Sequence, residues 1–224
     1  MDEPVQRLSR FQPADAPSGL VVETEAENAE ATRLVAALQA VLIAKGLLAP
    51  AEVEGEIARL MAPGLHLGAR LVARAWIDAG FKERLVHDGK QGAAELGAKV
   101  SEARLIVVEN TPALHNLITC TLCSCYPRSI LGQPPSWYIS KAYRARAVRE
   151  PRKLLEEFGF HLPAEVRLRV HDSNADMRYL VLPMRPVGTD GWPEDRLATL
   201  VTRDALIGTA PAAEPHQRLV PVGT

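Results

Sequence analysis

Three cysteines in one short segment are the residues of this sequence best suited to chemistry. Cys120, Cys123 and Cys125 have the spacing Cys-x-x-Cys-x-Cys, and the 224-residue chain contains no other cysteine. They are too few, and odd in number, for the disulfide framework of a secreted domain. Thiolates at such short spacing are typical metal ligands, so we expect a metal site here.

Four other uses of these cysteines are open from spacing alone. An iron–sulfur cluster normally takes four cysteines, one more than the chain has. His115 would complete a structural Cys3His zinc site, although the single residue between Cys123 and Cys125 makes tetrahedral geometry awkward. A thioredoxin-like pair needs a βαβ context that is not evident in the sequence. Simple packing is the last use, and so tight a cluster in a chain without other cysteines argues against it.

The Cys123-Ser124-Cys125 unit offers a further mode of metal binding, because the backbone nitrogens of Ser124 and Cys125 lie between the two sulfurs. If both amides are deprotonated, neighbouring donors close small chelate rings and form a planar S-N-N-S claw. Cys120 can then bind axially and leave a sixth position open for water or substrate, as a catalytic Lewis acid requires. Two amidate ligands need a strongly acidic ion, which disfavours zinc and favours trivalent cobalt or iron.

The elements that must position these cysteines are predicted from the spacing of apolar residues. Helical patterns cover 68–97 with breaks at Gly80 and Gly89, 141–158 with a break at Pro151, and 192–206. Strand patterns cover 105–108, 166–170 and 179–182. We therefore expect an α+β fold in which a small sheet region surrounds the cysteines.

The N-terminal quarter is predicted to stand apart from that body. Residues 1–22 have little periodicity and indicate an extended arm. Thr24 and Glu27 form a capping-box pattern that begins a helix ending near Gly46, and a second helix is expected over 51–61. We therefore divide the chain into an arm and helical hairpin at 1–61, which would form a subunit interface, and an α+β metal-binding catalytic domain at 62–224.

Composition excludes several classes of function. The chain has 26 basic and 27 acidic residues and a formal net charge of -1, which gives no uniform attraction for nucleic acid. The longest mostly apolar run, 34–44, is too short to span a membrane, and the N-terminus lacks the features of a secretory signal. We expect a cytoplasmic protein that binds neither nucleic acid nor membrane. The basic run at 141–153 is interpreted as a subunit interface or a solvated face.

Longer stretches around the cysteines resemble the metal-binding α subunit of nitrile hydratases. The centre of the resemblance is VVENTP at 107–112, His115-Asn116, and CTLCSCYP at 120–127. Further matches occur in order: VARAW at 72–76, PPSWY at 134–138, YRARAVREPR at 143–152, RYLVLP at 178–183 and GTDGW at 188–192. The resemblance covers about residues 25–210, and its cysteine motif is highly specific.

This resemblance implies hydration of a nitrile to an amide at a non-haem, non-corrin metal centre. It implies sulfur ligands from Cys120, Cys123 and Cys125, and backbone nitrogen ligands from Ser124 and Cys125. In the family the cysteine matching Cys123 is oxidised to sulfinate and that matching Cys125 to sulfenate, so Cys123, Ser124 and Cys125 are the expected catalytic residues. Thr121 matches the cobalt-type pattern Cys-Thr-Leu-Cys, which favours cobalt(III) over iron(III).

The resemblance also implies partners. Oxidised cysteines carry negative charge, and in the family arginines of a separate β subunit compensate much of it. We therefore expect a β subunit and a cobalt-loading activator protein as partners. Within this chain, Thr121 and Arg178 are expected to support the cysteines from a second layer.

The segment after the cysteines departs from the family pattern. The family commonly reads WPVLGLPP where this chain reads RSILGQPP at 128–135. If Arg128, Ser129 and Gln133 line the pocket, the enzyme should favour a larger, polar or heteroaromatic nitrile. Alternatively, Arg128 pairs with a carboxylate of the partner subunit.

Two other functions stay open beside the nitrile hydratase. The metal-bearing subunit of a thiocyanate hydrolase has a similar cysteine motif and a substrate that also contains a C–N triple bond. A structural zinc module in an interaction protein is a different class altogether, and elemental analysis separates it from both enzymes.

Overall fold

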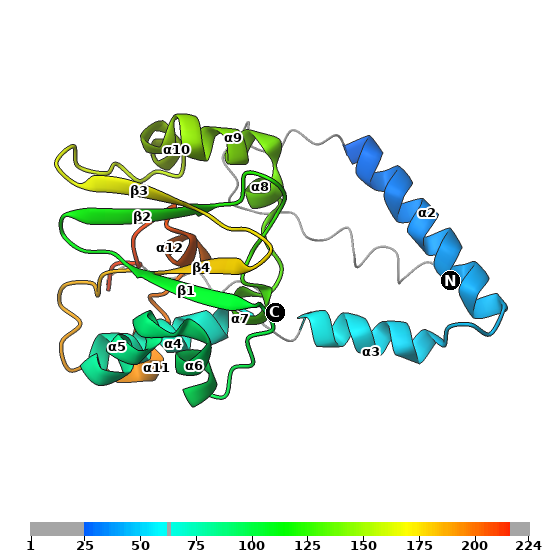
Figure 1. Cartoon of the computed structure of the whole chain (residues 1–224), viewed down its shortest axis with the longest axis horizontal. Helices are drawn as coiled ribbons and strands as arrows, with labels where there is room; N and C mark the ends of the chain where they lie inside the picture. The colour runs from blue at the N-terminus through cyan, green and yellow to red at the C-terminus, as the bar shows by residue number, and fades with distance from the viewer. Residues whose placement is uncertain (1–24, 62–63, 216–224) are drawn as a thin grey trace.

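The structure is a computed structural model that describes residues 25–61 and 64–215. It begins with a helical hairpin of α2 (Glu25–Ala44) and α3 (Pro50–Met61), which projects from the main body (Figure 1). Large apolar side chains of α2 are exposed, among them Leu34, Leu38 and Val41. The predicted hairpin is therefore present, whereas Thr24 of the predicted capping box lies outside the described residues.

Three helices follow where one interrupted pattern was predicted: α4 (Leu65–Ile77), α5 (Ala79–His87) and α6 (Gly89–Glu95). Both predicted breaks are present but displaced, the one at Gly80 by two residues and the one at Gly89 by one. The chain breaks at Asp78 and Asp88, whose carboxylates accept hydrogen bonds from the first backbone N–H groups of α5 and α6. Aspartate N-caps, not glycine flexibility, therefore set these boundaries.

Four strands form two parallel pairs. They are β1 (Arg104–Glu109), β2 (Leu114–Thr119), β3 (Arg167–Asp172) and β4 (Met177–Leu182). Strand β1 pairs with β4, and β2 pairs with β3 in a register that sets Thr119 beside Asp172. The three predicted strands are confirmed, and β2, which leads directly into the cysteines, was missed.

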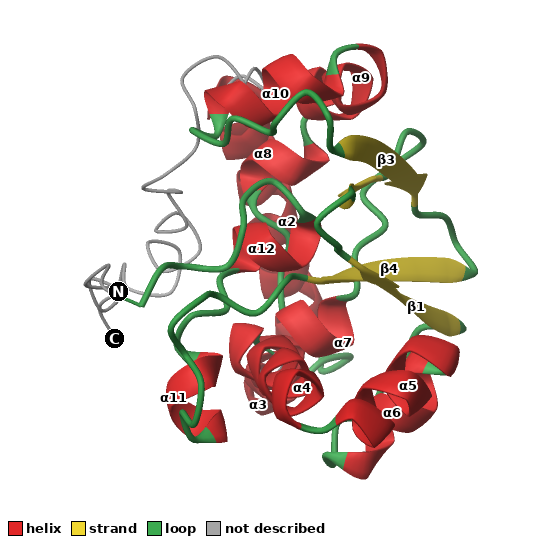
Figure 2. Cartoon of the chain, turned by 90° about the vertical axis from the view of Figure 1, so that its left-hand side faces the viewer, coloured by secondary structure: helices red, strands yellow, loops and turns green. Residues whose placement is uncertain are grey.

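The remaining helices are short. They are α7 (Arg128–Leu131), α8 (Ser136–Ile139), α9 (Lys141–Arg149), α10 (Pro151–Glu157), α11 (Glu194–Ala198) and α12 (Arg203–Ile207). The break at Pro151 is confirmed. The single helix predicted over 192–206 is wrong, because the chain leaves α11 and restarts at Thr202, whose hydroxyl accepts from the Ala205 N–H. Helices α8–α10 lie on one side of the strands and α4–α6 with α11 on the other (Figures 1 and 2).

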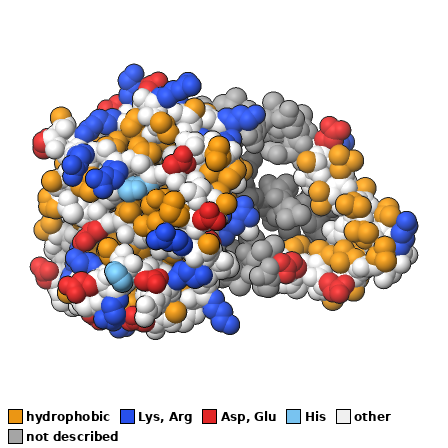
Figure 3. Space-filling view, in the orientation of Figure 1, with side chains coloured by type: hydrophobic (Ala, Val, Ile, Leu, Met, Phe, Trp, Pro, Cys, Tyr) orange, Lys and Arg blue, Asp and Glu red, His pale blue; other side chains and the backbone are white. Residues whose placement is uncertain are grey.

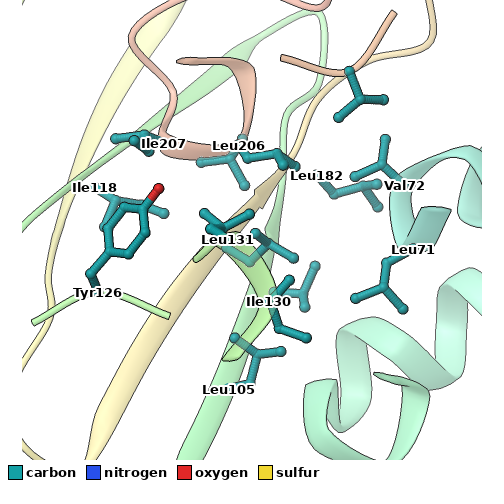
Figure 4. Close-up of a cluster of buried hydrophobic side chains, with 14 of the residues drawn as sticks. Leu71, Val72, Leu105, Ile118, Tyr126, Ile130, Leu131, Leu182, Leu206 and Ile207 are labelled. Carbon is teal, nitrogen blue, oxygen red and sulfur yellow. The ribbon is translucent and has the colours of Figure 1, made fainter. Parts of the chain in front are cut away.

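The hydrophobic core joins these layers. It contains side chains from α4, the strands, α7 and α12, including Leu71, Leu105, Ile118, Leu131, Leu182 and Leu206 (Figure 4). Gly208 has a φ of 88° and lies against β2, where a Cβ would collide with the carbonyl oxygen of Asn116. Glycine is therefore required for α12 to pack this closely on the strand that leads into the cysteines. The observed fold is a mixed α+β arrangement, as predicted.

Candidate metal centre

The three cysteines lie on a loop at the end of β2, residues 120–125, called the claw loop below. Buried tyrosines bind the strand just before this loop and the last residue of the loop. The hydroxyl of Tyr143 in α9 donates to the carbonyl oxygen of Ile118, and that of Tyr138 in α8 donates to the carbonyl oxygen of Cys125, at 2.6 and 2.8 Å. The loop is thus held between a core strand and two helices.

The claw loop brings its three sulfurs together. The Sγ atoms of Cys120 and Cys123 are 3.5 Å apart, those of Cys123 and Cys125 are 3.1 Å apart, and all three lie within 4.8 Å of one another. All three cysteines are free, with Cys120 and Cys125 buried and Cys123 exposed. The Cys123 N–H also donates to Cys120 Sγ at 3.3 Å, so the backbone folds around the cluster.

The pKa values of the thiols on the claw loop bear on whether this site binds a cation. Burial raises the pKa of Cys125 to about 12, whereas a hydrogen bond with Cys125 lowers the pKa of Cys123. The Cys125 thiol therefore keeps its proton at neutral pH unless a cation compensates its charge, because burial disfavours the thiolate. A small, highly charged ion would compensate three thiolates at this spacing. The donor set of converging sulfurs fits a thiophilic metal ion.

Thr121 is held by a carboxylate that sequence reasoning did not identify. The Thr121 N–H donates to Asp172 Oδ1 at 2.8 Å, and the Thr121 hydroxyl donates to Asp172 Oδ2 at 2.6 Å. Asp172 ends β3 and reaches the claw loop because β2 and β3 are paired in register. The sequence did show an acidic residue, Asp172, just after the predicted strand 166–170. Its contact with Thr121 could not be predicted because β2, the strand that pairs with β3, had not been recognised.

Arg178 of β4 influences the same cluster through its charge. Its positive charge contributes to lowering the pKa of Cys125, although burial raises that pKa by more. Its Nε is buried without a hydrogen-bond partner in the described structure, and its Nη1 makes only a long bond of 3.5 Å to the Met177 carbonyl oxygen. A half-buried arginine whose Nε lacks a hydrogen-bond partner in the described structure is suited to stabilising negative charge on these sulfurs.

His115 does not join the sulfurs. Its ring is buried, with Nε2 2.8 Å from the Gly208 carbonyl oxygen and Nδ1 3.2 Å from Asn110 Nδ2. Asn110 in turn accepts from the backbone and side-chain N–H groups of Asn116, whose own amide oxygen lies 2.9 Å from His171 Nε2. This network holds β2 in place. Among the described residues, the potential metal-binding group contains the three cysteines and no histidine, which argues against the Cys3His zinc site.

The three residues predicted to line a pocket occupy different environments. Arg128 is exposed, and its guanidinium makes no ion pair with any residue that the structure describes. Ser129 is buried, and both its N–H and its hydroxyl donate to the carboxylate of Glu102. Gln133 is half-buried. The Ser129 hydroxyl therefore anchors α7 to the loop before β1.

Comparison with known proteins places this site in a family. The family model for the nitrile hydratase alpha chain matches residues 29–210. The cobalt-containing nitrile hydratase subunit alpha of Pseudonocardia thermophila is 48% identical over 192 residues, which cover 82% of this chain and 91% of the relative. The thiocyanate hydrolase subunit gamma of Thiobacillus thioparus is 49% identical over 154 residues, which cover 63% of each chain.

Solved structures agree with the sequence relatives. A double mutant of the Fe-type nitrile hydratase from Comamonas testosteroni Ni1 superposes with a TM-score of 0.79 at 42% identity, covering 88% of this chain and 97% of the other. Both the fold and the cysteine-bearing segment fall within the matched range. The chain belongs to the nitrile hydratase alpha-chain family.

Proposed function

We propose that this chain is the metal-bearing subunit of a nitrile hydratase, which hydrates a nitrile to the corresponding amide. The observation that carries the proposal is the convergence of three free sulfurs on the claw loop. Cys120, Cys123 and Cys125 would supply sulfur ligands, and the backbone nitrogens of Ser124 and Cys125 the remaining protein ligands. A trivalent ion held there supplies Lewis acidity toward a nitrile C–N triple bond.

Cobalt(III) is the proposed ion. The relative from Pseudonocardia thermophila is described as cobalt-containing, and Thr121 gives this chain the Cys-Thr-Leu-Cys sequence. The solved relative from Comamonas testosteroni is described as Fe-type, so iron(III) is the alternative.

The chain's own residues position and charge the reacting groups. Tyr138 and Asp172 fix the claw loop at Cys125 and Thr121. In this proposal molecular oxygen has already oxidised Cys123 to sulfinate and Cys125 to sulfenate before turnover. The sulfenate oxygen of Cys125 is suited to attack a nitrile carbon held beside it, and water replaces the oxygen that leaves in the amide. Arg178 would stabilise the negative charge on that side of the site.

A second subunit is needed to close the site. Leu122, at the tip of the claw loop, is 83% exposed, and Cys123 is exposed beside it. A catalytic centre works best when bulk solvent is excluded, so that only the reacting water enters, and when its charges are compensated. We propose that a β subunit covers the claw loop and also contacts the arm and hairpin at 1–61, with 62–224 as the catalytic domain. An activator protein that loads cobalt is a further proposed partner.

The segment after the claw loop is proposed to influence the choice of substrate. Arg128 is exposed close to Cys125 in sequence, and Gln133 is half-buried at the end of α7. Side chains with hydrogen-bond donors at these positions favour a polar or heteroaromatic nitrile over a small aliphatic one. Ser129, whose hydroxyl is bound to Glu102, would act by holding this segment in place.

Thiocyanate hydrolysis is the second candidate function, favoured by Arg128 in particular. Thiocyanate is an anion, and an exposed guanidinium without an ion pair in the described structure is suited to attract it. The thiocyanate hydrolase relative from Thiobacillus thioparus shows that such an activity occurs among similar chains.

Metal analysis together with peptide mass spectrometry tests the main proposal. We expect about one cobalt per chain in the active complex, with little zinc, and a claw-loop peptide heavier by three oxygen atoms, two on Cys123 and one on Cys125. Stoichiometric zinc with full activity would falsify the cobalt assignment and support a zinc protein. Three unmodified thiols in an active complex would contradict the role given to the sulfenate.

A further inference from the structure

A groove of about 270 Å³ lies directly beside the claw loop. It is lined by Thr121 of that loop and by Lys141, Arg144, Ala145, Val148 and Arg149 of α9. The residues from α9 follow the spacing i, i+3, i+4, i+7 and i+8, which places them on one face of the helix. One wall of the groove is therefore the metal-site loop, and the other is a single helix face.

Three positive charges line this groove, and the nearby carboxylate of Asp172 accepts two hydrogen bonds from Thr121. Lys141, Arg144 and Arg149 make no ion pair with any residue between 25 and 61 or between 64 and 215. The Arg144 guanidinium donates to the carbonyl oxygens of Thr121 and Ser140, at 3.3 and 3.4 Å, which orients it without neutralising it. A concave surface lined by three cations attracts negatively charged groups.

Other basic side chains on α9 and α10 form ion pairs with glutamates. Arg146, on α9, pairs with Glu157, and Lys153, on α10, pairs with Glu150 at 3.4 Å. Lysine and arginine side chains gather over the part of the body where α9, α10 and β3 lie (Figure 3). The groove is thus a distinct part of a basic surface, in which the cations face an open space instead of a carboxylate.

The apolar part of the groove favours a polypeptide as its occupant. Val148 is 53% exposed, and Ala145 beside it is also exposed. A small inorganic anion would leave both uncovered, whereas a peptide can pair carboxylates with the cations and place an aliphatic side chain on Val148. Nucleic acid is disfavoured because Tyr143, the aromatic residue of α9, is fully buried and cannot stack on a base.

The position of the groove indicates which polypeptide binds there. Thr121 belongs to both the groove and the claw loop, and the exposed Leu122 and Cys123 follow it directly. A subunit that covers the claw loop would therefore extend onto the groove. We propose that the groove binds an acidic segment of the second subunit, with its carboxylates on Lys141 and Arg149 and an aliphatic side chain on Val148. This inference rests on the proposed function, which supplies the second subunit.

The test measures how tightly the second subunit binds this chain when the charges of the groove are reversed. We expect Lys141→Glu with Arg149→Glu to weaken association by about tenfold or more at low salt, and to reduce the dependence of Kd on salt. The matched control is Lys99→Glu with Arg104→Glu, which makes the same change of charge at exposed residues before and at the start of β1. Association of the control should change by less than about twofold.

Carbodiimide cross-linking of the wild-type complex provides a second readout. Lys141 is expected to form an amide with an aspartate or glutamate of the second subunit, identified by peptide mass spectrometry. Equal affinities of the groove variant and the control would overturn the proposal, and so would saturable binding of inorganic phosphate or of a single-stranded oligonucleotide that the groove variant alone abolishes. If either of these outcomes is found in a complex that is still active, the groove proposal fails but the proposed function stands. Failure of the wild-type chain to bind the second subunit would reject both.

Discussion

At the scale of single residues, the two hydrogen bonds that Thr121 donates to Asp172 fix the claw loop from β3. A carboxylate that accepts both the N–H and the hydroxyl of one residue fixes the position of that residue. Hydrogen bonds to charged groups contribute about 1.5–3 kcal/mol each where water is excluded, and less at an exposed position such as this one. Asp172 is therefore a positioning residue for the sulfurs on either side of Thr121.

Replacing Asp172 tests this role. We expect Asp172→Ala to lower the cobalt retained per chain after dialysis against a chelator by about tenfold, because the loop loses its acceptor, and Asp172→Asn to have a smaller effect because one acceptor oxygen remains. Cobalt content and the rate of thiol alkylation in the metal-free protein are the measurements. Asp176→Asn, at an exposed position between β3 and β4, is the control. Wild-type retention in Asp172→Ala would show that the loop is fixed by other contacts.

Arg128 separates the two candidate substrates. Arg128→Trp removes a cation and adds an apolar surface, so kcat/KM for thiocyanate or for a polar heterocyclic nitrile should fall relative to that for a small aliphatic nitrile. The measurement is the ratio of kcat/KM values in the assembled enzyme, for wild type and variant. An unchanged ratio would place Arg128 at the subunit interface instead of the pocket.

At the scale of elements, β2 depends on a polar network inside an otherwise apolar layer. Burial is the largest influence on the pKa of His115 and lowers it. The hydrogen bond to the Gly208 carbonyl raises this pKa by a smaller amount. The folded chain therefore resists protonation of His115. Below the unfolded-state pKa of about 6.5, the unfolded chain takes up a proton that the folded chain does not, so stability falls as pH falls.

The pH dependence of stability checks this account of β2. Between pH 7.5 and 5.5 the wild type should lose stability through His115 with a slope of at most about 1.4 kcal/mol per pH unit. His115→Gln keeps a donor for the Gly208 carbonyl but does not titrate, so its Tm should be lower at pH 7.5 and should depend less on pH. His87→Gln, at an exposed end of α5, should retain the wild-type dependence. Parallel curves for His115→Gln and wild type would contradict this explanation.

At the scale of the whole molecule, two of the apolar surfaces that the described structure leaves exposed bear on the proposed second subunit. One is the tip of the claw loop at Leu122, and the other is the apolar face of α2. Exposed apolar surface on a projecting hairpin is typical of a protein interface. The isolated chain should therefore be nearly inactive, with activity recovered when the second subunit is added.

A pair of substitutions on α2 tests the second surface. Leu38 is 60% exposed, so Leu38→Asp should leave the Tm of the isolated chain within about 2 °C while weakening subunit association by about tenfold or more. Ala40→Asp introduces the same charge on the other side of this helix and should weaken association far less. Sedimentation or calorimetry measures the affinity. Equal affinities of the two variants would exclude this face of α2 from the interface.

What the sequence determined by itself is the chemistry that depends on local spacing. Three cysteines separated by two and one residues lie close together along the chain, so the cluster and the family were predictable from residues 120–127. The helical hairpin and the helix break at Pro151 were also predictable, because periodicity and proline act over a few residues.

The tertiary structure decided everything that depends on contacts between distant segments. Strand β2 was missed because His115 and Asn116 interrupt its apolar pattern, and they are tolerated only because partners such as Gly208, 93 residues away, satisfy their polar atoms. Asp172 reaches Thr121 across 51 residues, and this depends on the register of β2 with β3. The cations of α9 form one wall of a groove only because that helix packs beside the claw loop. Parallel pairing, buried hydrogen bonds and helix packing are fixed when the chain folds as a whole, so no local pattern in the sequence specifies them.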